Sequence, residues 1–204
     1  MNDRFPRAVL DQESQQREDI KALKAAETPN NIPFNANKIG HVVLMVSDLE
    51  RSTEFYTKVL GFRVSDVYPE SMMPGRMVFL RLNDDHHGVA IVGGSERHVD
   101  SSEMHHMAFA VDTLDEVFRA RDHLRKQGVK IEFEGRRRAG CQVAVEFCDP
   151  DGHFLEIYWG LDQVSPNDIV RPASEWTPVA SLEEAVDNAP PGQNTKLSDP
   201  GLRE

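Results

Sequence analysis

The sequence predicts an α+β fold in which two paired βαβββ modules form an open, curved mixed sheet. A strand-like apolar run followed by an amphipathic helix occurs twice, and three further strand-like runs follow each helix. The histidine near the start of each copy and the glycine that ends each helix recur at nearly the same spacing. One copy alone cannot bury both faces of its short sheet, so the two copies are expected to pair.

The first module begins with the apolar run at residues 39–46, which predicts a strand. Ser47-Asp-Leu-Glu50 has the spacing of a capping box, and apolar residues then recur at helical spacing until Gly61. Three more strands are expected, over residues 62–68, 77–82 and 88–92.

The second module repeats this layout. The apolar run at residues 104–111 predicts its first strand, and Thr113-Leu-Asp-Glu116 is a capping box for a helix that ends at Gly128. Three strands are again expected, over residues 129–134, 141–147 and 154–159.

The patterned region is expected to be one domain over residues 38–160, with modules at 38–97 and 103–160. Residues 1–37 have the composition of a polar N-terminal arm, and residues 161–204 that of an acidic, proline-rich C-terminal tail. The arm carries no recognisable chemistry of its own.

Each flanking segment predicts one helix. The arm favours a helix between Gln12 and Ala26, and Ser181-Leu-Glu-Glu184 is a capping box for a short helix in the tail. The tail is expected to wrap around the domain or to close over its site as a lid.

Composition narrows the class of protein. The chain has 204 residues, a formal net charge of −11 and an isoelectric point near 5.2, which disfavours a nucleic-acid partner. No apolar run is long enough for a membrane span, and the N-terminus lacks the apolar stretch of a secretory signal. Two cysteines are too few for a disulfide framework. We therefore expect a cytoplasmic protein with a small-molecule ligand.

Two histidines and one carboxylate predict a metal site. His41 and His106 occupy equivalent positions in the two modules, and Glu156 interrupts an apolar and aromatic strand. A charge there needs a partner, because an unpaired buried carboxylate is costly. Each residue alone also has an ordinary structural interpretation. Either histidine could be a core or surface residue with its hydrogen bonds satisfied, and Glu156 could face solvent on an edge strand. Together they predict a facial triad, which leaves coordination positions open and suits Fe(II).

Three segments carry a resemblance to a known family. Residues 39–62, Met104-His-His-Met-Ala-Phe-Ala-Val111 and Asp149-Pro-Asp-Gly-His-Phe-Leu-Glu-Ile-Tyr158 resemble motifs of the vicinal oxygen chelate superfamily, in order and spacing. The resemblance implies paired βαβββ modules around a divalent metal. The superfamily includes glyoxalases, epimerases, thiol transferases, metal-free binding proteins and extradiol dioxygenases, so the fold alone leaves the reaction open.

The ligand set makes the chain most similar to the single-domain type I extradiol dioxygenases, of the catechol 2,3-dioxygenase type. The fourth ligand of the glyoxalase pattern falls on Ala90 and is missing. The resemblance implies that His41, His106 and Glu156 hold Fe(II), with Mn(II) or another divalent metal as alternatives. It further implies that His87 is the acid/base histidine, although His86 and His87 also fit an ordinary turn.

The sequence departs from that pattern around the expected substrate. Glu146 stands where many extradiol enzymes have a tyrosine, and Arg137 where they tend to have a histidine. The three arginines at 136–138 could bind a substrate carboxylate or belong to a solvated loop. Tyr158 shares a strand face with Glu156, where it could support the site or simply pack. Glu146, Arg137 and Tyr158 are therefore the candidate substrate-binding residues.

The expected function is that of an Fe(II)-dependent extradiol ring-cleaving dioxygenase acting on a catechol-like vicinal diol with O2. We expect a homodimer, and the sequence leaves open whether one chain or two supply the site. The first alternative is another metal-dependent reaction of the superfamily, an isomerase, epimerase or lyase step, for which Glu146 could be the base. The second is a non-catalytic protein that binds an aromatic ligand.

Overall fold

The computed structural model describes residues 11–27, 38–96, 104–164 and 169–203. Its helices are α1 (Glu18–Lys24), α2 (Leu49–Glu54), α3 (Leu114–Lys126) and α4 (Leu182–Asp187), with a π-helix, η2 (Phe55–Val59), continuing α2, and short 3-10 helices η1 (Ser14–Gln16), η3 (Ala173–Glu175) and η4 (Pro200–Arg203). Its strands are β1 (Val42–Met45), β2 (Arg63–Tyr68), β3 (Met77–Arg81), β4 (Val89–Val92), β5 (Met107–Ala110), β6 (Ile131–Arg136), β7 (Val143–Cys148) and β8 (Phe154–Trp159).

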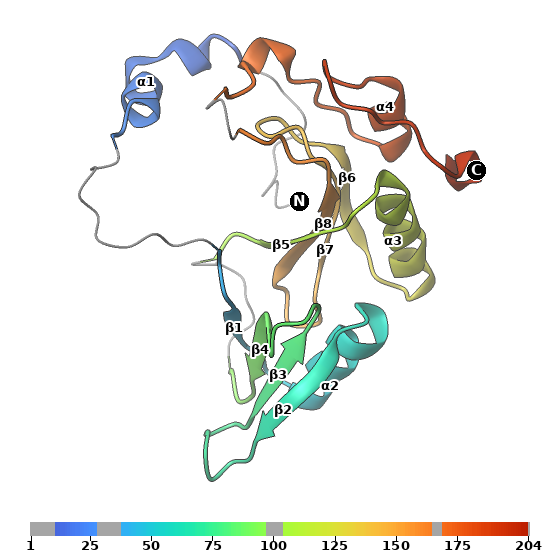
Figure 1. Ribbon diagram of the computed structural model, residues 1–204. Helices are drawn as coiled ribbons and strands as arrows, with labels where there is room; N and C mark the ends of the chain where they lie inside the picture. Colours follow the sequence, from blue (N-terminus) through green and yellow to red (C-terminus); the bar gives the residue numbers. More distant parts are fainter. Residues whose placement is uncertain (1–10, 28–37, 97–103, 165–168, 204) are drawn as a thin grey trace. The chain divides into compact units, whose positions relative to one another are not determined.

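These elements form two compact units, each with one mixed four-stranded sheet (Figure 1). The strand orders are β1-β4-β3-β2 and β5-β8-β7-β6. In each sheet the first strand of the module pairs in parallel with the last, and the other pairings whose register is resolved are antiparallel. The prediction of an α+β fold with two βαβββ modules is therefore confirmed. We call the two parts the β1–β4 unit and the β5–β8 unit.

The β1–β4 unit comprises residues 31–106, as far as they are described, and the turn at 148–154. Helix α2 packs on one face of its sheet, against β3 and β4. Buried side chains of this core include Leu44, Leu80 and Ile91. A second apolar cluster, Met77, Phe79, Ala90 and Val92, covers the other face of the sheet.

The start of α2 corrects the expected capping box. Asp48, not Ser47, is the N-cap, and its side chain accepts a hydrogen bond from the Arg51 backbone N–H at 2.9 Å. Ser47 donates from its backbone N–H and its hydroxyl to the Asp151 carboxylate instead, at 2.8 and 2.5 Å. Asp48 is the N-cap in place of Ser47 because the Ser47 hydroxyl is hydrogen-bonded to Asp151, a buried carboxylate about a hundred positions away.

The β5–β8 unit contains α3, α4 and the β5–β8 sheet. The predicted capping box of α3 is confirmed in both directions: Thr113 accepts from the Glu116 backbone, and the Glu116 side chain accepts from the Thr113 backbone. The apolar stripe of the helix, Leu114, Val117, Phe118 and Leu124, is buried.

The tail packs against this unit as a layer of the fold. Helix α4 lies on β6, and Val179 pairs with Arg136 in an isolated antiparallel bridge. The Arg136 side chain is fully buried and donates to the backbone oxygens of Ala185, Asn188 and Thr177 and to the side chains of Thr177 and Gln193. One arginine thus satisfies several carbonyl groups of the tail at once.

Replacing Arg136 with Met should lower the free energy of unfolding by about 3 kcal/mol, because buried carbonyl groups of the tail lose their donor. Urea unfolding followed by circular dichroism measures the change. The control is Arg125→Met, which removes the ion pair of a half-exposed arginine with Glu134 and should cost less than about 1 kcal/mol. Equal costs for the two variants would show that Arg136 does not hold the tail.

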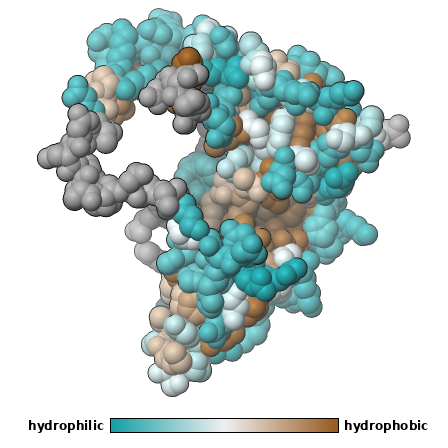
Figure 2. All heavy atoms as spheres, viewed as in Figure 1, coloured by the Kyte–Doolittle hydropathy of each residue, from teal (hydrophilic) through white to brown (hydrophobic). Residues whose placement is uncertain are grey.

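The N-terminal region contains α1, which lies within the segment expected to be helical. None of its residues is buried, and its surface is largely hydrophilic in Figure 2. Within the described residues, no helix is long and apolar enough to cross a membrane.

Candidate metal and substrate site

The two candidate histidine ligands lie one residue before their strands, not within them. The parallel ladder of β1 begins with Val42 opposite Val89, and that of β5 with Met107 opposite Leu155. His41 and His106 therefore stand at the strand ends, and both are exposed. The sequence pattern overestimated the strands because apolar residues continue before the point where pairing starts.

His41 lies against His87 in the β1–β4 unit. Their ring centroids are 4.6 Å apart, and the ring of His87 also meets the edge of Phe79 at 5.0 Å. The Nδ1 atoms of His86 and His87 are 3.0 Å apart. Desolvation and the neighbouring His41 and His86 lower the pKa of His87, which favours the neutral imidazole.

His105 and His106 form a second pair of rings. Their Nδ1 atoms are 2.8 Å apart, and both side chains are exposed. The sequence assigned only His106 to the site, since neighbouring residues on a strand face opposite ways. Because both lie before β5 begins, strand alternation does not separate them.

Glu156 lies in the middle of β8 and is 3% exposed. Strand β8 lies between β5 and β7, so the solvent-facing edge interpretation does not apply. Desolvation, reinforced by the charge of Glu146, raises the pKa of Glu156 to about 7 despite opposing contributions from Gln142 and Arg137. A buried carboxylate of this kind is stabilised by a nearby cation.

The register of the two sheets shows how the modules correspond. Glu156 on β8 is opposite Ala108 on β5, and Ala90 on β4 is opposite Val43 on β1. Ala108 and Val43 each lie two residues after a candidate histidine ligand. Ala90 therefore holds in the first module the place that Glu156 holds in the second, and only one of the two modules supplies a carboxylate.

Arg137 and Glu146 form a tight ion pair in the β5–β8 unit. Two guanidinium nitrogens of Arg137 contact the two carboxylate oxygens of Glu146 at 2.7 and 2.5 Å. The guanidinium lies 3.6 Å from the centre of the Phe133 ring. Side-chain exposure is 17% for Arg137 and 6% for Glu146.

The arginine run is thus not a solvated loop with three equivalent side chains. Arg136 is buried within the tail, and Arg137 is engaged by Glu146. Tyr158 is half-buried on β8, opposite Ala110 and two residues beyond Glu156. The three candidate substrate-binding residues therefore belong to the same unit as Glu156.

The structure brings the candidate residues together in two groups. His41 lies with His87 in the β1–β4 unit, and Glu146 and Arg137 act on Glu156 in the β5–β8 unit. His106 belongs to the β1–β4 unit. Among the residues that the structure describes, no three His, Cys, Asp or Glu side chains form a group that could hold a metal ion. The triad thus stays a prediction.

Sequence reasoning gave no role to the turn between β7 and β8, which carries a buried polar network. Asp149 accepts hydrogen bonds from the Tyr56 hydroxyl and from the backbone N–H groups of Asp151 and His153, and it contacts His153 Nδ1 at 2.8 Å. Asp151 binds Ser47, Ser52 and Arg51. The one available signal was two aspartates and a histidine in five residues, which alone suggest only a turn.

Asp151→Asn should destabilise the protein by about 2 kcal/mol at neutral pH, because several hydrogen bonds to a carboxylate are weakened. Burial alone would raise the pKa of Asp151, but the hydrogen bonds from Ser47 and Ser52 and the charge of Arg51 lower it. This stabilisation is full above the unfolded-state pKa of about 4 and is lost as the pH falls through the lower folded value.

Chemical denaturation of the two proteins between pH 3 and pH 7 measures this difference. The exposed Asp84→Asn variant is the control and should match the wild type throughout. A difference between Asp151→Asn and wild type that stays constant over this pH range would contradict the account.

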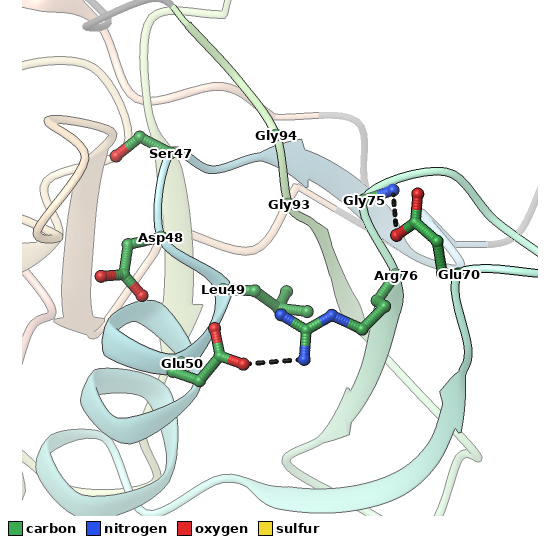
Figure 3. Close-up of a pocket in the computed structure, with 9 residues that line it drawn as sticks. All are labelled: Ser47, Asp48, Leu49, Glu50, Glu70, Gly75, Arg76, Gly93 and Gly94. Carbon is green, nitrogen blue, oxygen red and sulfur yellow. Dashed lines mark hydrogen bonds and ion pairs between the residues drawn. The ribbon is translucent and has the colours of Figure 1, made fainter.

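A surface hollow in the β1–β4 unit is separate from these residues (Figure 3). Gly75 and Gly93 pack backbone to backbone there, since a Cβ on Gly75 would lie 2.1 Å from the Gly93 carbonyl oxygen. Arg76 forms an ion pair with Glu50 across the hollow at 2.7 Å. No candidate site residue lines it, so it plays no part in the function considered below.

Comparisons with known proteins agree with this architecture. Residues 38–157 match the family model described as Glyoxalase/Bleomycin resistance protein/Dioxygenase superfamily. The chain is 30% identical over 132 residues to 3-methylcatechol 2,3-dioxygenase of Pseudomonas putida, a stretch that covers 62% of this chain and 43% of that protein. It is 32% identical over 135 residues to biphenyl-2,3-diol 1,2-dioxygenase of Paraburkholderia xenovorans, covering 65% of this chain and 44% of that protein.

Among solved structures, the fosfomycin resistance protein FosX of Listeria monocytogenes, complexed with Mn(II) and sulfate, matches with a TM-score of 0.50 at 21% identity. The match covers 62% of this chain and 92% of that one, and it bears on the fold alone. The chain spans less than half the length of the two dioxygenases that it matches. The resemblance drawn from the three sequence motifs is confirmed.

Proposed function

Because this chain belongs to the Glyoxalase/Bleomycin resistance protein/Dioxygenase superfamily, we propose that it is an Fe(II)-dependent extradiol dioxygenase. Its substrates are a catechol-like vicinal diol and O2, and the ring is cleaved beside the diol. The two dioxygenases that it resembles act on aromatic diols by name, which supports the substrate class.

The observation that carries the proposal is the difference between Ala90 and Glu156. The two residues hold equivalent places in the two sheets, and only the second module supplies a carboxylate. Together with His41 and His106, this gives three ligands rather than four. Three ligands leave room for a bidentate diol and O2 at one metal ion, whereas a four-ligand site leaves less.

The two imidazoles and one carboxylate are residue types that hold a divalent metal. Glu156 is buried where its charge is costly, and His41 and His106 are exposed at strand ends. We propose Fe(II) as the native metal, with Mn(II) as the alternative, held by His41, His106 and Glu156. When bound, the metal would supply Lewis acidity toward the diol and a path for electrons from the diol to O2.

His87 is the proposed acid/base group. Its lowered pKa keeps the imidazole neutral near pH 7, so it can accept a proton from a diol hydroxyl. Because Nδ1 faces His86, we assign this exchange to Nε2. The protonated ring then returns the proton to an oxygen of the opening product. Phe79 packs against the ring and fixes its orientation.

We further propose a cytoplasmic homodimer that binds neither nucleic acid nor membrane. Strands β1 and β5 lie at the edges of their sheets, and Val43 and Met45 on β1 are 45% and 51% exposed. Open edges and exposed apolar side chains are features that a second copy can cover. Light scattering should give twice the chain mass of 23.0 kDa, and a monomer at micromolar concentration would contradict this.

The runner-up is an isomerase, epimerase or lyase reaction with Glu146 as base. Arg137 occupies both carboxylate oxygens of Glu146. A base needs a free lone pair directed at the substrate, so the arrangement favours the dioxygenase. A metal-free protein that binds an aromatic ligand is the third candidate, and tight ligand binding without metal would support it.

The experiment is a colour assay on protein purified anaerobically and loaded with Fe(II). Catechol and substituted catechols are added, then air, and the visible absorbance of the yellow ring-fission product is followed. We expect colour with Fe(II) and none with metal-free protein. Firmly bound metal without colour across the panel would favour the isomerase-type reaction instead.

A further inference from the structure

We propose that the Arg137–Glu146 ion pair makes this site select uncharged aromatic diols and reject diols that carry a carboxylate. The inference rests on the proposed function and names the substrate class of the same site. It reverses the simplest interpretation of an arginine beside a binding face, which is that the arginine binds an anionic group.

The first step is that the Nε and Nη2 edge of the Arg137 guanidinium already binds an internal carboxylate. Both Glu146 oxygens contact it, at 2.7 and 2.5 Å, in the bidentate geometry that a substrate carboxylate would need. The Phe133 ring lies 3.6 Å below the guanidinium. Arg137 is thus held between a ring and a carboxylate and cannot swing to a new partner without leaving both.

The second step concerns the cost of displacing Glu146. Its side chain is 6% exposed, so a substrate that took its place on Arg137 would leave a buried carboxylate without its counter-charge. Glu146 also acts electrostatically on Glu156, which is itself buried. A substrate carboxylate here would meet two carboxylates and one guanidinium.

The third step is the position of the pair in the sheet. Glu146 is opposite Phe133 in the β6–β7 register, and the backbone of Arg137 bonds to Gln142, whose side chain hydrogen-bonds Glu156. Arg137 and Glu146 therefore border the candidate ligand Glu156 on the same sheet. A substituent that extends from a diol at Glu156 toward Glu146 would therefore meet this pair.

The test compares catechol with 2,3-dihydroxybenzoate, which differs from catechol by one carboxylate. Binding to protein loaded with redox-inactive Zn(II) is measured by NMR titration, so that the diol meets a divalent metal and the readout needs neither iron nor O2. Wild-type protein should bind catechol at least tenfold more tightly, which corresponds to about 1.4 kcal/mol. Glu146→Gln should abolish or invert that preference, because Arg137 then accepts the added carboxylate.

Two variants control this result. Glu134→Gln removes the neighbouring carboxylate on β6, whose partner is Arg125, and should behave as wild type. The double variant Arg137→Met with Glu146→Gln should lose the gain in dihydroxybenzoate binding, because the gain depends on the guanidinium.

Tighter binding of 2,3-dihydroxybenzoate than of catechol by the wild type overturns the inference, whether or not Glu146→Gln folds. No binding of either probe to any variant also overturns it, because the face is then not a diol-binding surface. The proposed function is judged separately, by cleavage of catechol with Fe(II). If the protein cleaves catechol but binds dihydroxybenzoate more tightly, the inference is wrong and the proposed function stands. If the binding preferences are as expected but no diol is cleaved, the proposed function is wrong.

Discussion

Alanine at His41, His106 or Glu156 should reduce metal retention after gel filtration to a trace. Each variant leaves two ligands from the protein, and two ligands hold a divalent ion far more weakly than three. Glu156→Ala should have a second effect, a gain in stability of the metal-free protein, because it removes a buried carboxylate whose charge is costly there. Metal per chain is measured by mass spectrometry after loading with Fe(II) under nitrogen.

The matched control is His123→Ala, which removes an exposed histidine from the last turn of α3. It should retain as much metal as the wild type. Metal that stays bound in all three ligand variants would mean that the triad is assigned to the wrong residues.

His87→Ala should lower kcat by about 10²- to 10⁴-fold while the protein keeps its metal, because general acid/base catalysis typically contributes that much. Retained metal with a lower kcat distinguishes the proposed role of His87 from that of His41, a proposed metal ligand whose ring is only 4.6 Å away. Initial rates with catechol and metal analysis of the same sample give both readouts. The loss should lie in kcat rather than in KM, since His87 acts on protons and not on the binding of the diol.

His123→Ala is the control for that experiment too, because His123 lies on α3 in the β5–β8 unit and has no proposed proton role. Its kcat should stay within about threefold of the wild type. A His87→Ala variant with unchanged kcat, or one that loses its metal, would show that His87 is not the acid/base group.

Much of the fold follows from local patterns. Strand β8 begins and ends where the apolar and aromatic run of Phe154–Trp159 predicts, and the capping box of α3 forms as its sequence spacing predicts. These elements are set by residues a few positions apart. The same reasoning placed Glu156 within an apolar strand, and the structure shows it buried there.

The features that the sequence did not reveal depend on contacts between distant residues. The N-cap of α2 shifts because Asp151 binds Ser47, 104 positions away. Arg136 stands in a run of three arginines that suggests exposure, yet the tail buries it through bonds to residues 41 to 57 positions ahead. The sequence pattern likewise did not predict that Arg137 pairs with Glu146, although it indicated both as candidate substrate-binding residues. The periodicity of a sequence indicates which face of a helix or strand is apolar, but it does not indicate which distant residue contacts that face.

The most direct test of the central claim is the stoichiometry of O2 uptake. Fe(II)-loaded protein is mixed with a limiting, known amount of catechol in an oxygen electrode, and the product is quantified in the same sample. The account predicts one O2 consumed for each diol, with ring-opened product in equal amount and no hydrogen peroxide. Conversion of catechol without O2 uptake, or no conversion by protein that holds its metal firmly, would contradict it.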